Sequence, residues 1–360
     1  MTKLGAITLT RQGLEICRRI QDAWPACEVF VARKYDALAP AHWRRFDGGL
    51  SPLVQEIFGA YEGLIFVMAT GIVVRAIAPF IVDKRYDPGI VVVDIAGRFA
   101  ISLCAGHMGG ANQLASDLGA ILGAVPVITT GTDVNQTLAP DMLAKELGAE
   151  IENWETLKTV SGMLVDGEPV AIFAETGIKL PELERFAAKG VVRIASLDQL
   201  DSRFKAAVVI SHRVYTAQPP AKLPTLWVRP KSLVVGIGCD RGTTVEEIER
   251  AFEQVLCESG LSPLSVRNLA TYALKKDEPG LCAFAQKRGL KLSAFEREEI
   301  NRVQHLIPNP SPTVLKYAGV LGVAEPAAML SAGARTVLVP KRKCGRVTLA
   351  VALTEEGRGA

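Results

Sequence analysis

The chain has 360 residues, 49% of them hydrophobic and 22% charged, so a packed globular protein of two or three domains is expected. Its 41 basic and 38 acidic residues leave a net charge of +3, which is too small to indicate a nucleic-acid partner. Seven cysteines without a C-x-x-C pair favour reduced thiols over a disulfide framework or a zinc site. The most apolar run, residues 63–74, is too short to span a membrane, and the N-terminus lacks the pattern of a signal peptide. We therefore expect a soluble, cytoplasmic protein with no membrane partner.

Apolar runs and helical patterns alternate over residues 1–135. This alternation predicts an α/β domain with a largely parallel sheet. The expected strands are residues 4–10, 28–32, 64–68, 90–94, 99–104 and 127–130, with a helix over 112–122 among those between them.

A glycine-rich loop with one histidine follows the strand expected over residues 99–104. The segment RFAISLCAGHMGGANQL (98–114) reads as strand, small-residue turn and helix start, with His107 in the middle of the turn. Glycines allow a close backbone approach, and free N–H groups at a helix start favour an anion. The sequence leaves open whether His107 is an acid–base group or a structural histidine. Asp94 and Asp133, each at a strand end, could orient His107 or merely end a strand or cap a helix.

Residues 136–230 predict a small α/β linking domain. Short strands are expected over 170–174, 191–195, 207–210 and 226–228, separated by Pro- and Gly-containing turns. No set of chemistry-bearing residues stands out there, and the pair Ser211-His212 is interpreted as structural.

Residues 231–360 predict a third α/β domain. A strand from Leu233, a glycine turn and a helix capped by Thr243 or Thr244 come first, and closing strands are expected over 336–340 and 346–353. The glycines at 236, 238 and 242 are spaced one residue too widely for a dinucleotide-binding fingerprint, and no acidic residue ends the next strand. Glu325, at a helix start, is either an ordinary dipole-matched residue or a site group.

Three blocks of the chain resemble the CbiG family of cobalt-precorrin-5A hydrolases in anaerobic cobalamin biosynthesis. The first block runs from Thr70 to Ala115 and continues with VITTGTD (127–133). The middle segment is similar to the family's weakly patterned linking region. The last block contains GIGCDRGTT (236–244), NLATYALKKDEPGL (268–281) and GVAEPAAM (322–329). Their order along the chain makes the resemblance specific.

The resemblance implies hydrolysis of cobalt-precorrin-5A, in which a δ-lactone opens and acetaldehyde leaves to give cobalt-precorrin-5B. Cobalt would enter with the substrate, so no cofactor and no protein metal site are expected. His107 would act as base, with Asp94 and Asp133 as further catalytic candidates, and the amides of Gly109, Gly110 and Ala111 would bind the oxyanion. The corrinoid's carboxylate arms call for basic partners, Lys275 among them. The expected substrate-binding residues are Arg75, Lys84, Arg85, Gly106, Gly109, Gly110, Asn112, Arg241, Lys276, Glu325 and Lys341.

Two departures from the family pattern bear on the mechanism. Ala105 stands where the family commonly has serine, which favours attack by water over a serine nucleophile, and Gly131 replaces an alanine. The corrinoid substrate is the expected partner, and other enzymes of the pathway are further candidates. The alternative function is a non-catalytic carrier or scaffold for a corrinoid intermediate.

Overall fold

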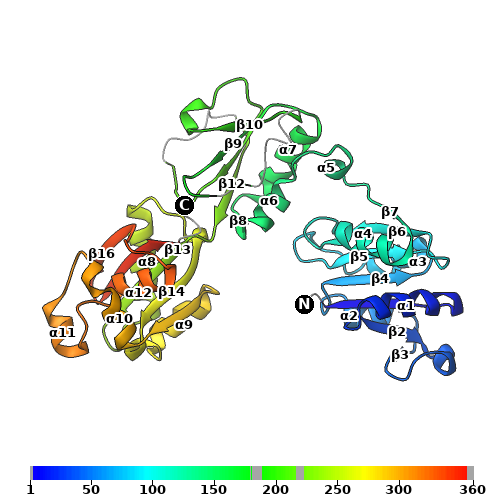
Figure 1. Cartoon of the computed structure of the whole chain (residues 1–360), viewed down its shortest axis with the longest axis horizontal. Helices are drawn as coiled ribbons and strands as arrows, with labels where there is room; N and C mark the ends of the chain where they lie inside the picture. The colour runs from blue at the N-terminus through cyan, green and yellow to red at the C-terminus, as the bar shows by residue number, and fades with distance from the viewer. Residues whose placement is uncertain (1–2, 179, 181–188, 216–222, 355–360) are drawn as a thin grey trace. The chain divides into compact units, whose positions relative to one another are not determined.

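The computed structural model describes residues 3–178, 180, 189–215 and 223–354, and over these residues the strands form three sheets of seven, five and five strands (Figure 1). The chain divides into two compact units, Met1–Thr137 and Leu138–Ala360. The first unit holds one sheet and the second holds two, each with its own helices. Three sheets with their covering helices confirm the predicted α/β fold class.

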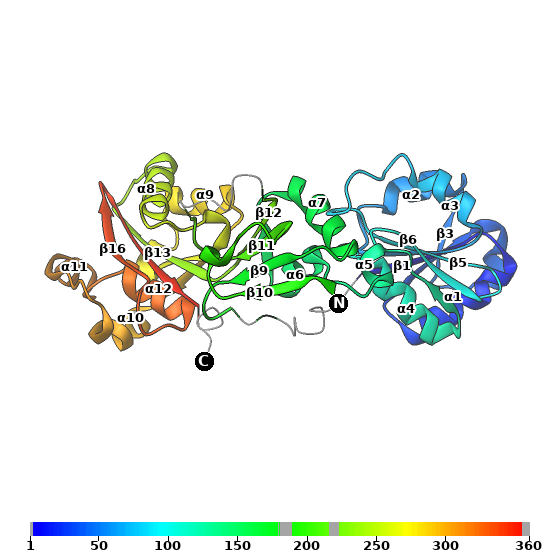
Figure 2. The ribbon, with the colours of Figure 1, turned by 90° about the horizontal axis from the view of Figure 1, so that it is seen from above.

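The first unit is a seven-stranded sheet covered by helices on both faces. Within strand β4 (Gly63–Val67), which is buried throughout, Leu64 and Phe66 pack toward α2 and α3, whereas Ile65 and Val67 pack toward α1 and α4. Figure 2 shows these two helix pairs on opposite sides of the sheet. The strand order is β3-β2-β1-β4-β5-β6-β7. The elements are β1 (Leu4–Thr8), α1 (Arg11–Ala23), β2 (Glu28–Ala32), η1 (Arg33–Leu38), β3 (Arg44–Phe46), α2 (Leu50–Ile57), α3 (Thr70–Ile77), β5 (Gly89–Val93), β6 (Phe99–Cys104), α4 (Ala111–Leu122), β7 (Val125–Val127) and α5 (Gly131–Val134).

One reversal of chain direction in this sheet sets the position of the site. Strands β1 to β5 are parallel, whereas β6 runs antiparallel to β5 and β7 runs parallel to β6. Strands β6 and β7 therefore end at the edge where β1 to β5 begin. We call this the His107 edge and the opposite one the Asp94 edge.

The second unit begins with a sheet of order β10-β9-β11-β12-β8, parallel except for β8. The short strand β8 pairs with β12, and the sequence analysis did not predict it as a strand. Helices α6 and α7 pack their apolar side chains onto this sheet. The elements are α6 (Pro140–Glu146), β8 (Ala149–Ile151), α7 (Trp154–Val165), β9 (Val170–Ala174), β10 (Val191–Ile194), η3 (Leu197–Gln199), β11 (Ala206–Ile210) and β12 (Thr225–Pro230).

The Ser211-His212 pair follows β11 and makes hydrogen bonds inside the second unit. Ser211 Oγ donates to Glu175 Oε2 over 2.5 Å, and the carbonyl oxygen of His212 accepts from the Ser262 N–H over 2.9 Å. The His212 side chain is buried, and this burial lowers the pKa of its imidazole.

The third sheet has the order β15-β14-β13-β17-β16, with helices α8 and α9 on one face and α10 and α12 on the other (Figure 2). Thr244 is the cap of α8, because its hydroxyl accepts from the Glu247 N–H while the Glu247 carboxylate accepts from the Thr244 N–H. Strand β16 begins three residues later than expected. The elements are β13 (Leu233–Cys239), α8 (Val245–Glu258), η4 (Pro263–Ser265), β14 (Val266–Tyr272), η5 (Ala273–Lys275), α9 (Pro279–Lys287), β15 (Lys291–Phe295), α10 (Arg297–Val303), η6 (Gln304–Leu306), α11 (Pro312–Ala318), α12 (Ala324–Ala332), β16 (Val339–Cys344) and β17 (Val347–Leu353).

Two of the glycines after Leu233 lie where neighbouring elements leave no room for a side chain. A Cβ at Gly236 would lie 1.9 Å from the Ala324 carbonyl oxygen, so α12 approaches β13 closely only because residue 236 is glycine. A Cβ at Gly238 would lie 2.7 Å from Thr348 Oγ1. These contacts explain two of the three glycines without a dinucleotide.

Candidate functional site

The carboxyl ends of β6 and β7 bring His107 and Asp133 together at the His107 edge. The His107 loop follows β6, and helix α5, which holds Thr132 and Asp133, comes after β7, which is parallel to β6. His107 Nε2 lies 2.7 Å from Asp133 Oδ2 and 3.2 Å from Thr132 Oγ1. The His107 side chain is 13% exposed and the Asp133 side chain 41%, so the pair borders solvent. A neutral imidazole that donates from Nε2 to a carboxylate carries its basic lone pair on Nδ1.

Asn112, in the first turn of α4, holds Asp133 from the other side. Its Nδ2 donates to Asp133 Oδ2 over 3.0 Å and to Thr130 Oγ1 over 2.9 Å, and the residue is buried. Oxygen Oδ2 of Asp133 thus faces donors on two sides, which fixes the carboxylate toward the imidazole. The sequence identified Asn112 as a substrate-binding candidate, whereas the structure gives it a partner within the site.

Two of the three amides expected to bind an oxyanion are used inside the loop. The Gly110 N–H donates to the His107 carbonyl oxygen over 3.1 Å, and the Ala111 N–H donates to the Ala105 carbonyl oxygen over 3.3 Å. The prediction of an oxyanion hole from Gly109, Gly110 and Ala111 is therefore wrong for Gly110 and Ala111. A tight loop closes by pairing its own N–H groups.

The three glycines of the loop have packing or conformational reasons of their own. Gly110 has φ +82°, a conformation that favours glycine. A Cβ at Gly106 would lie 2.6 Å from Asn112 Oδ1, and a Cβ at Gly109 would lie 2.8 Å from the Asp87 carbonyl oxygen. Ala105 takes φ +53° without being glycine, so the loop carries local strain.

Of the basic residues predicted in the first unit, two lie near the loop. Lys84 and Arg85 belong to the segment that leads into β5, whose start packs against Gly109, so they lie at the His107 edge. Arg85 pairs with Asp83 over 2.6 Å. Arg75 instead donates to the Gly71 carbonyl oxygen over 3.0 Å, at the Asp94 edge, where β4 ends.

Asp94 does not orient His107, which corrects that hypothesis. It ends β5, whereas Cys104 at the end of β6 pairs with Ile90 at the start of β5, so a whole strand separates Asp94 from the His107 loop. Asp94 Oδ1 accepts from the Arg98 N–H over 2.6 Å and from the Phe99 N–H over 2.8 Å. Partial burial alone would raise the pKa of Asp94, but these N–H donors outweigh it and hold the pKa below its ordinary value. Asp94 shapes the β5–β6 turn.

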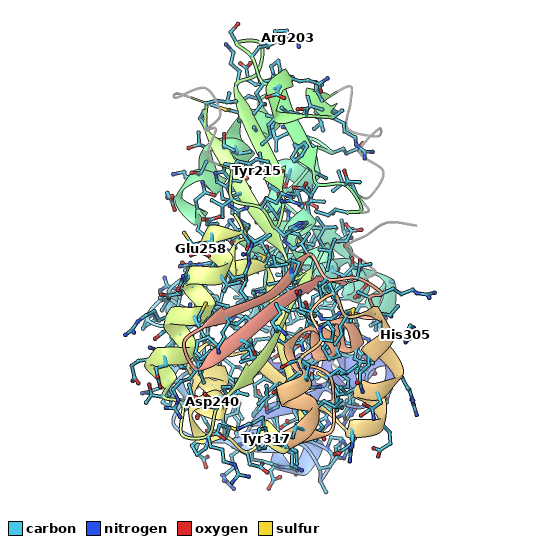
Figure 3. The ribbon with its side chains drawn as sticks, turned by 90° about the vertical axis from the view of Figure 1, so that its left-hand side faces the viewer. Arg203, Tyr215, Asp240, Glu258, His305 and Tyr317 are labelled. Atoms are coloured by element: carbon cyan, nitrogen blue, oxygen red, sulfur yellow. The ribbon has the colours of Figure 1, made fainter. Side chains whose placement is uncertain are left out.

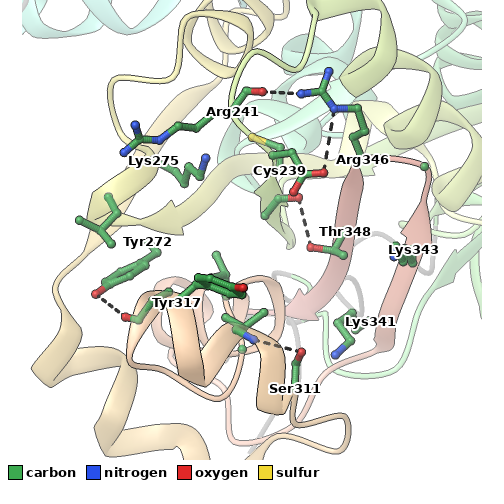
Figure 4. A pocket seen from close by; sticks show the side chains of 18 residues that line it. Cys239, Arg241, Tyr272, Lys275, Ser311, Tyr317, Lys341, Lys343, Arg346 and Thr348 are labelled. Atoms are coloured by element: carbon green, nitrogen blue, oxygen red, sulfur yellow. Dashed lines mark hydrogen bonds and ion pairs between the residues drawn. The ribbon is translucent and has the colours of Figure 1, made fainter.

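A pocket of about 670 Å³ lies in the second unit, where β13 and β14 end (Figure 4). Tyr272, Val314 and Tyr317 give it an apolar wall, and Tyr317 is 79% exposed. Figure 3 shows Asp240 and Tyr317 together at one end of the unit and Arg203 at the other. The basic side chains that line the pocket are Arg241, Lys275, Lys341, Lys343 and Arg346.

Some of these cations are held by their neighbours. Lys275 Nζ lies 3.4 Å from Glu278 Oε2, and Lys341 Nζ donates to the Asn309 carbonyl oxygen over 2.6 Å. Arg346 donates to the carbonyl oxygens of Arg241 and Gly242. These basic side chains are thus partly fixed in place before any ligand binds. Together with the apolar wall, they suit an anionic ligand with an apolar body.

The structure places the four C-terminal substrate-binding candidates differently. Arg241 and Lys341 line the pocket, as does Lys275, whereas the exposed Lys276 is not part of the lining. Glu325 is only 1% exposed, and its carboxylate accepts from the N–H of Lys341 over 2.9 Å and from the backbone and side chain of Asn309. Substrate binding by Glu325 is therefore corrected to a structural role.

The described residues contain no helix with the length and hydropathy to cross a membrane. In the same ranges, no group of three or more His, Cys, Asp or Glu side chains is arranged to hold a metal ion.

A His–Asp pair at strand ends, in a chain whose other unit carries a basic pocket, is typical of α/β enzymes that use acid–base chemistry on anionic substrates. Comparison with known proteins refines this class. Family models match in succession: Cobalamin synthesis G N-terminal over residues 52–133, Cobalamin biosynthesis central region over 138–230, and Cobalamin synthesis G C-terminus over 233–352.

Full-length relatives agree with these matches. The cobalt-precorrin-5A hydrolase of Priestia megaterium is 38% identical over 354 residues, covering 97% of this chain and 94% of the relative. That of Salmonella typhimurium is 34% identical over 352 residues, covering 97% of each. A solved structure is that of CobE, a protein from the cobalamin (vitamin B12) biosynthetic pathway. Its sequence is 31% identical to this chain, and the match covers 34% of this chain and 89% of the CobE chain, with a TM-score of 0.33. The chain belongs to the CbiG family of cobalamin biosynthesis proteins, as its motifs predict.

Proposed function

We propose that this protein is a cobalt-precorrin-5A hydrolase, which opens the δ-lactone of its substrate and releases acetaldehyde to give cobalt-precorrin-5B. The observation that carries this proposal is the His107–Asp133 pair, 2.7 Å apart at the ends of two parallel strands. The names of the two full-length relatives support it. Cobalt arrives bound to the substrate, and the protein supplies no cofactor. The cytoplasm, expected from seven free cysteines, is the proposed location.

The first step is lactone opening by water. His107, held by Asp133, takes a proton as the water oxygen bonds to the lactone carbonyl carbon. The tetrahedral intermediate collapses, the acyl carbon–oxygen bond breaks, and the leaving alkoxide takes a proton. We take water as the nucleophile because Ala105 offers no hydroxyl where the family commonly has serine, and burial raises the pKa of the neighbouring Cys104 thiol.

The second step releases the two-carbon fragment. The freed hydroxyl gives up its proton to the same base as the carbon–carbon bond breaks, and acetaldehyde leaves. The bonding electron pair stays on the ring carbon, which is then protonated. One base that is reprotonated between steps serves both, so a single His–Asp pair suffices for the whole reaction.

The basic pocket of the second unit is proposed to hold carboxylate arms of the corrinoid. Its cations match carboxylates, and Tyr272 and Tyr317 offer flat apolar surfaces to the macrocycle. Lys275 and Lys276 form a matched pair because they are adjacent in the chain and only Lys275 lines the pocket. Lys275→Ala should raise the dissociation constant for the corrinoid, followed by its absorption spectrum, and Lys276→Ala should not. Equal effects of the two variants would remove the pocket from the proposal.

The decisive experiment measures acetaldehyde release from cobalt-precorrin-5A by the wild type, His107→Ala and His42→Ala. His42 is an exposed histidine of the same unit whose ring contacts Gln21, so it controls for loss of any histidine. Release by the wild type and His42→Ala, with loss in His107→Ala, supports the proposal. Equal release by all three places the base elsewhere. Corrinoid binding without release by any of them would point to a carrier.

A further inference from the structure

Within the described part of the chain, the Ser102 hydroxyl contacts the site through the side chain of Asn112. Ser102 lies on β6, on the face that packs against α4, and its Oγ is 2.6 Å from Asn112 Oδ1. An amide oxygen accepts and never donates, so the Ser102 hydroxyl is the donor in this contact. A hydroxyl can donate or accept, whereas the Asp133 carboxylate only accepts, so the carboxylate decides which end of the Asn112 amide faces the strand.

With that end fixed, both amide hydrogens of Asn112 face the site. They reach Thr130 Oγ1 over 2.9 Å and Asp133 Oδ2 over 3.0 Å. A turned amide would present its oxygen to the Asp133 carboxylate, and two acceptors in contact repel each other. By donating to Oδ1, the Ser102 hydroxyl stabilises the amide orientation in which Nδ2 holds Asp133 toward His107.

The loop leaves the Asn112 amide little room to move. A Cβ at Gly106 would lie 2.6 Å from Asn112 Oδ1, and the Gly106 carbonyl oxygen accepts from the Asn112 N–H over 3.0 Å. Asn112 is 8% exposed, so water cannot readily replace a lost partner. The Asn112 side-chain amide is thus held by Ser102 on the strand, by the loop, and by the side chains of Thr130 and Asp133.

We propose that Ser102 is a positioning residue for the reaction, acting through Asn112 and Asp133 on His107. This inference rests on the proposed function and assigns a role to a residue that the sequence did not single out. Because Ser102 is assigned a role through Asn112 and not in substrate binding, its loss should lower kcat and leave KM unchanged. Its effect should also depend on Asn112 being present.

The test compares Ser102→Ala and Ser102→Thr with Ser116→Ala in acetaldehyde release. Ser116 is the matched control because its hydroxyl bonds the backbone carbonyl oxygen of Asn112 over 3.0 Å and does not touch the amide. We expect Ser102→Ala to lose about tenfold in kcat, as for a buried acceptor left without its donor. Ser102→Thr should restore most of the rate, and Ser116→Ala should match the wild type. In a protein that already carries Asn112→Ala, adding Ser102→Ala should lower kcat by less than about twofold.

Several outcomes would overturn the inference. A wild-type kcat in Ser102→Ala, or losses that multiply in the double variant, would show that the hydroxyl does not act through Asn112. If the wild type released no acetaldehyde, the proposed function would fail first. The inference would then be judged from the ¹⁵N signals of His107 in histidine-labelled protein, assigned by their loss in His107→Gln. Ser102→Ala should move these signals and Ser116→Ala should not. Unmoved signals in both would refute it.

Discussion

Replacing Asp133 with asparagine removes one charge from the candidate site and keeps its shape. In the native chain Oδ2 accepts from His107 Nε2 over 2.7 Å and from Asn112 Nδ2 over 3.0 Å. An asparagine oxygen has two lone pairs and can accept both bonds, so Asp133→Asn should fold normally. What is lost is the attraction between the carboxylate and the positive charge that forms on the imidazole as it takes a proton.

The size of that attraction follows from distance and exposure. Charges about 4 Å apart attract by about 1 kcal/mol in water and about 4 kcal/mol in a half-buried setting. The Asp133 side chain is 41% exposed, so the lower part of that range applies. A loss of about 1–2 kcal/mol corresponds to a kcat reduced roughly 5- to 30-fold.

The assay is acetaldehyde release under saturating substrate, with Asp117→Asn as control. Asp117 is a carboxylate on α4 whose recorded partner is Gln113, over 2.7 Å, and it has no contact with the pair. Asp117→Asn should keep the wild-type rate. A wild-type rate in Asp133→Asn, or an equal loss in Asp117→Asn, would refute the role given to the carboxylate.

Three further predictions concern the second unit. Gly236→Ala should destabilise it by about 3 kcal/mol in a denaturant titration, because the new Cβ would lie 1.9 Å from a carbonyl oxygen of α12. The control Gly162→Ala, on an open helix face, should stabilise the unit slightly in the same titration. Glu325→Ala should cost about 3 kcal/mol by the same measure, since three N–H donors of Asn309 and Lys341 lose the buried carboxylate that accepts from them, and an unchanged midpoint would contradict the structural role. Burial lowers the pKa of His212 below its ordinary value of 6.5, so the unfolded chain binds the proton more readily. The free energy of unfolding should therefore fall as the pH drops below about 6.5, by at most about 1.4 kcal/mol per pH unit. His212→Gln should make the free energy of unfolding depend less on pH in this range.

Local patterns in the sequence predict much of the fold. Buried strands such as β4 are continuous apolar runs, and the cap at Thr244 is visible as a threonine three residues before a glutamate. The His107 loop is visible as small residues between a strand and a helix. Each of these signals lies within a few neighbouring residues, and this is why sequence alone identifies them.

The error over Asp94 arose from strand direction. Only a few residues join β5 to β6, and so short a connection permits antiparallel pairing alone. Asp94 and Cys104 must then lie at opposite edges of the sheet. The sequence carried this signal, but the expectation of a largely parallel sheet hid it.

The environment of Glu325 could not be predicted in the same way. Its partners Asn309 and Lys341 are each 16 residues away in the chain, and no local pattern links them. Ser102 was missed for a related reason, since its contact with Asn112 crosses from strand to helix. Such contacts depend on tertiary packing, which residue spacing does not reveal.

The reversal at β6 gives the first unit two chemically separate edges. Segment η1 follows β2 and lies at the Asp94 edge, away from the His107 loop. A short affinity tag inserted in η1 would attach this unit to a sensor surface through the edge of the sheet opposite its His–Asp pair. Ligand binding could then be followed in real time on the immobilised protein, with the tether on the opposite edge of the sheet from the reacting groups.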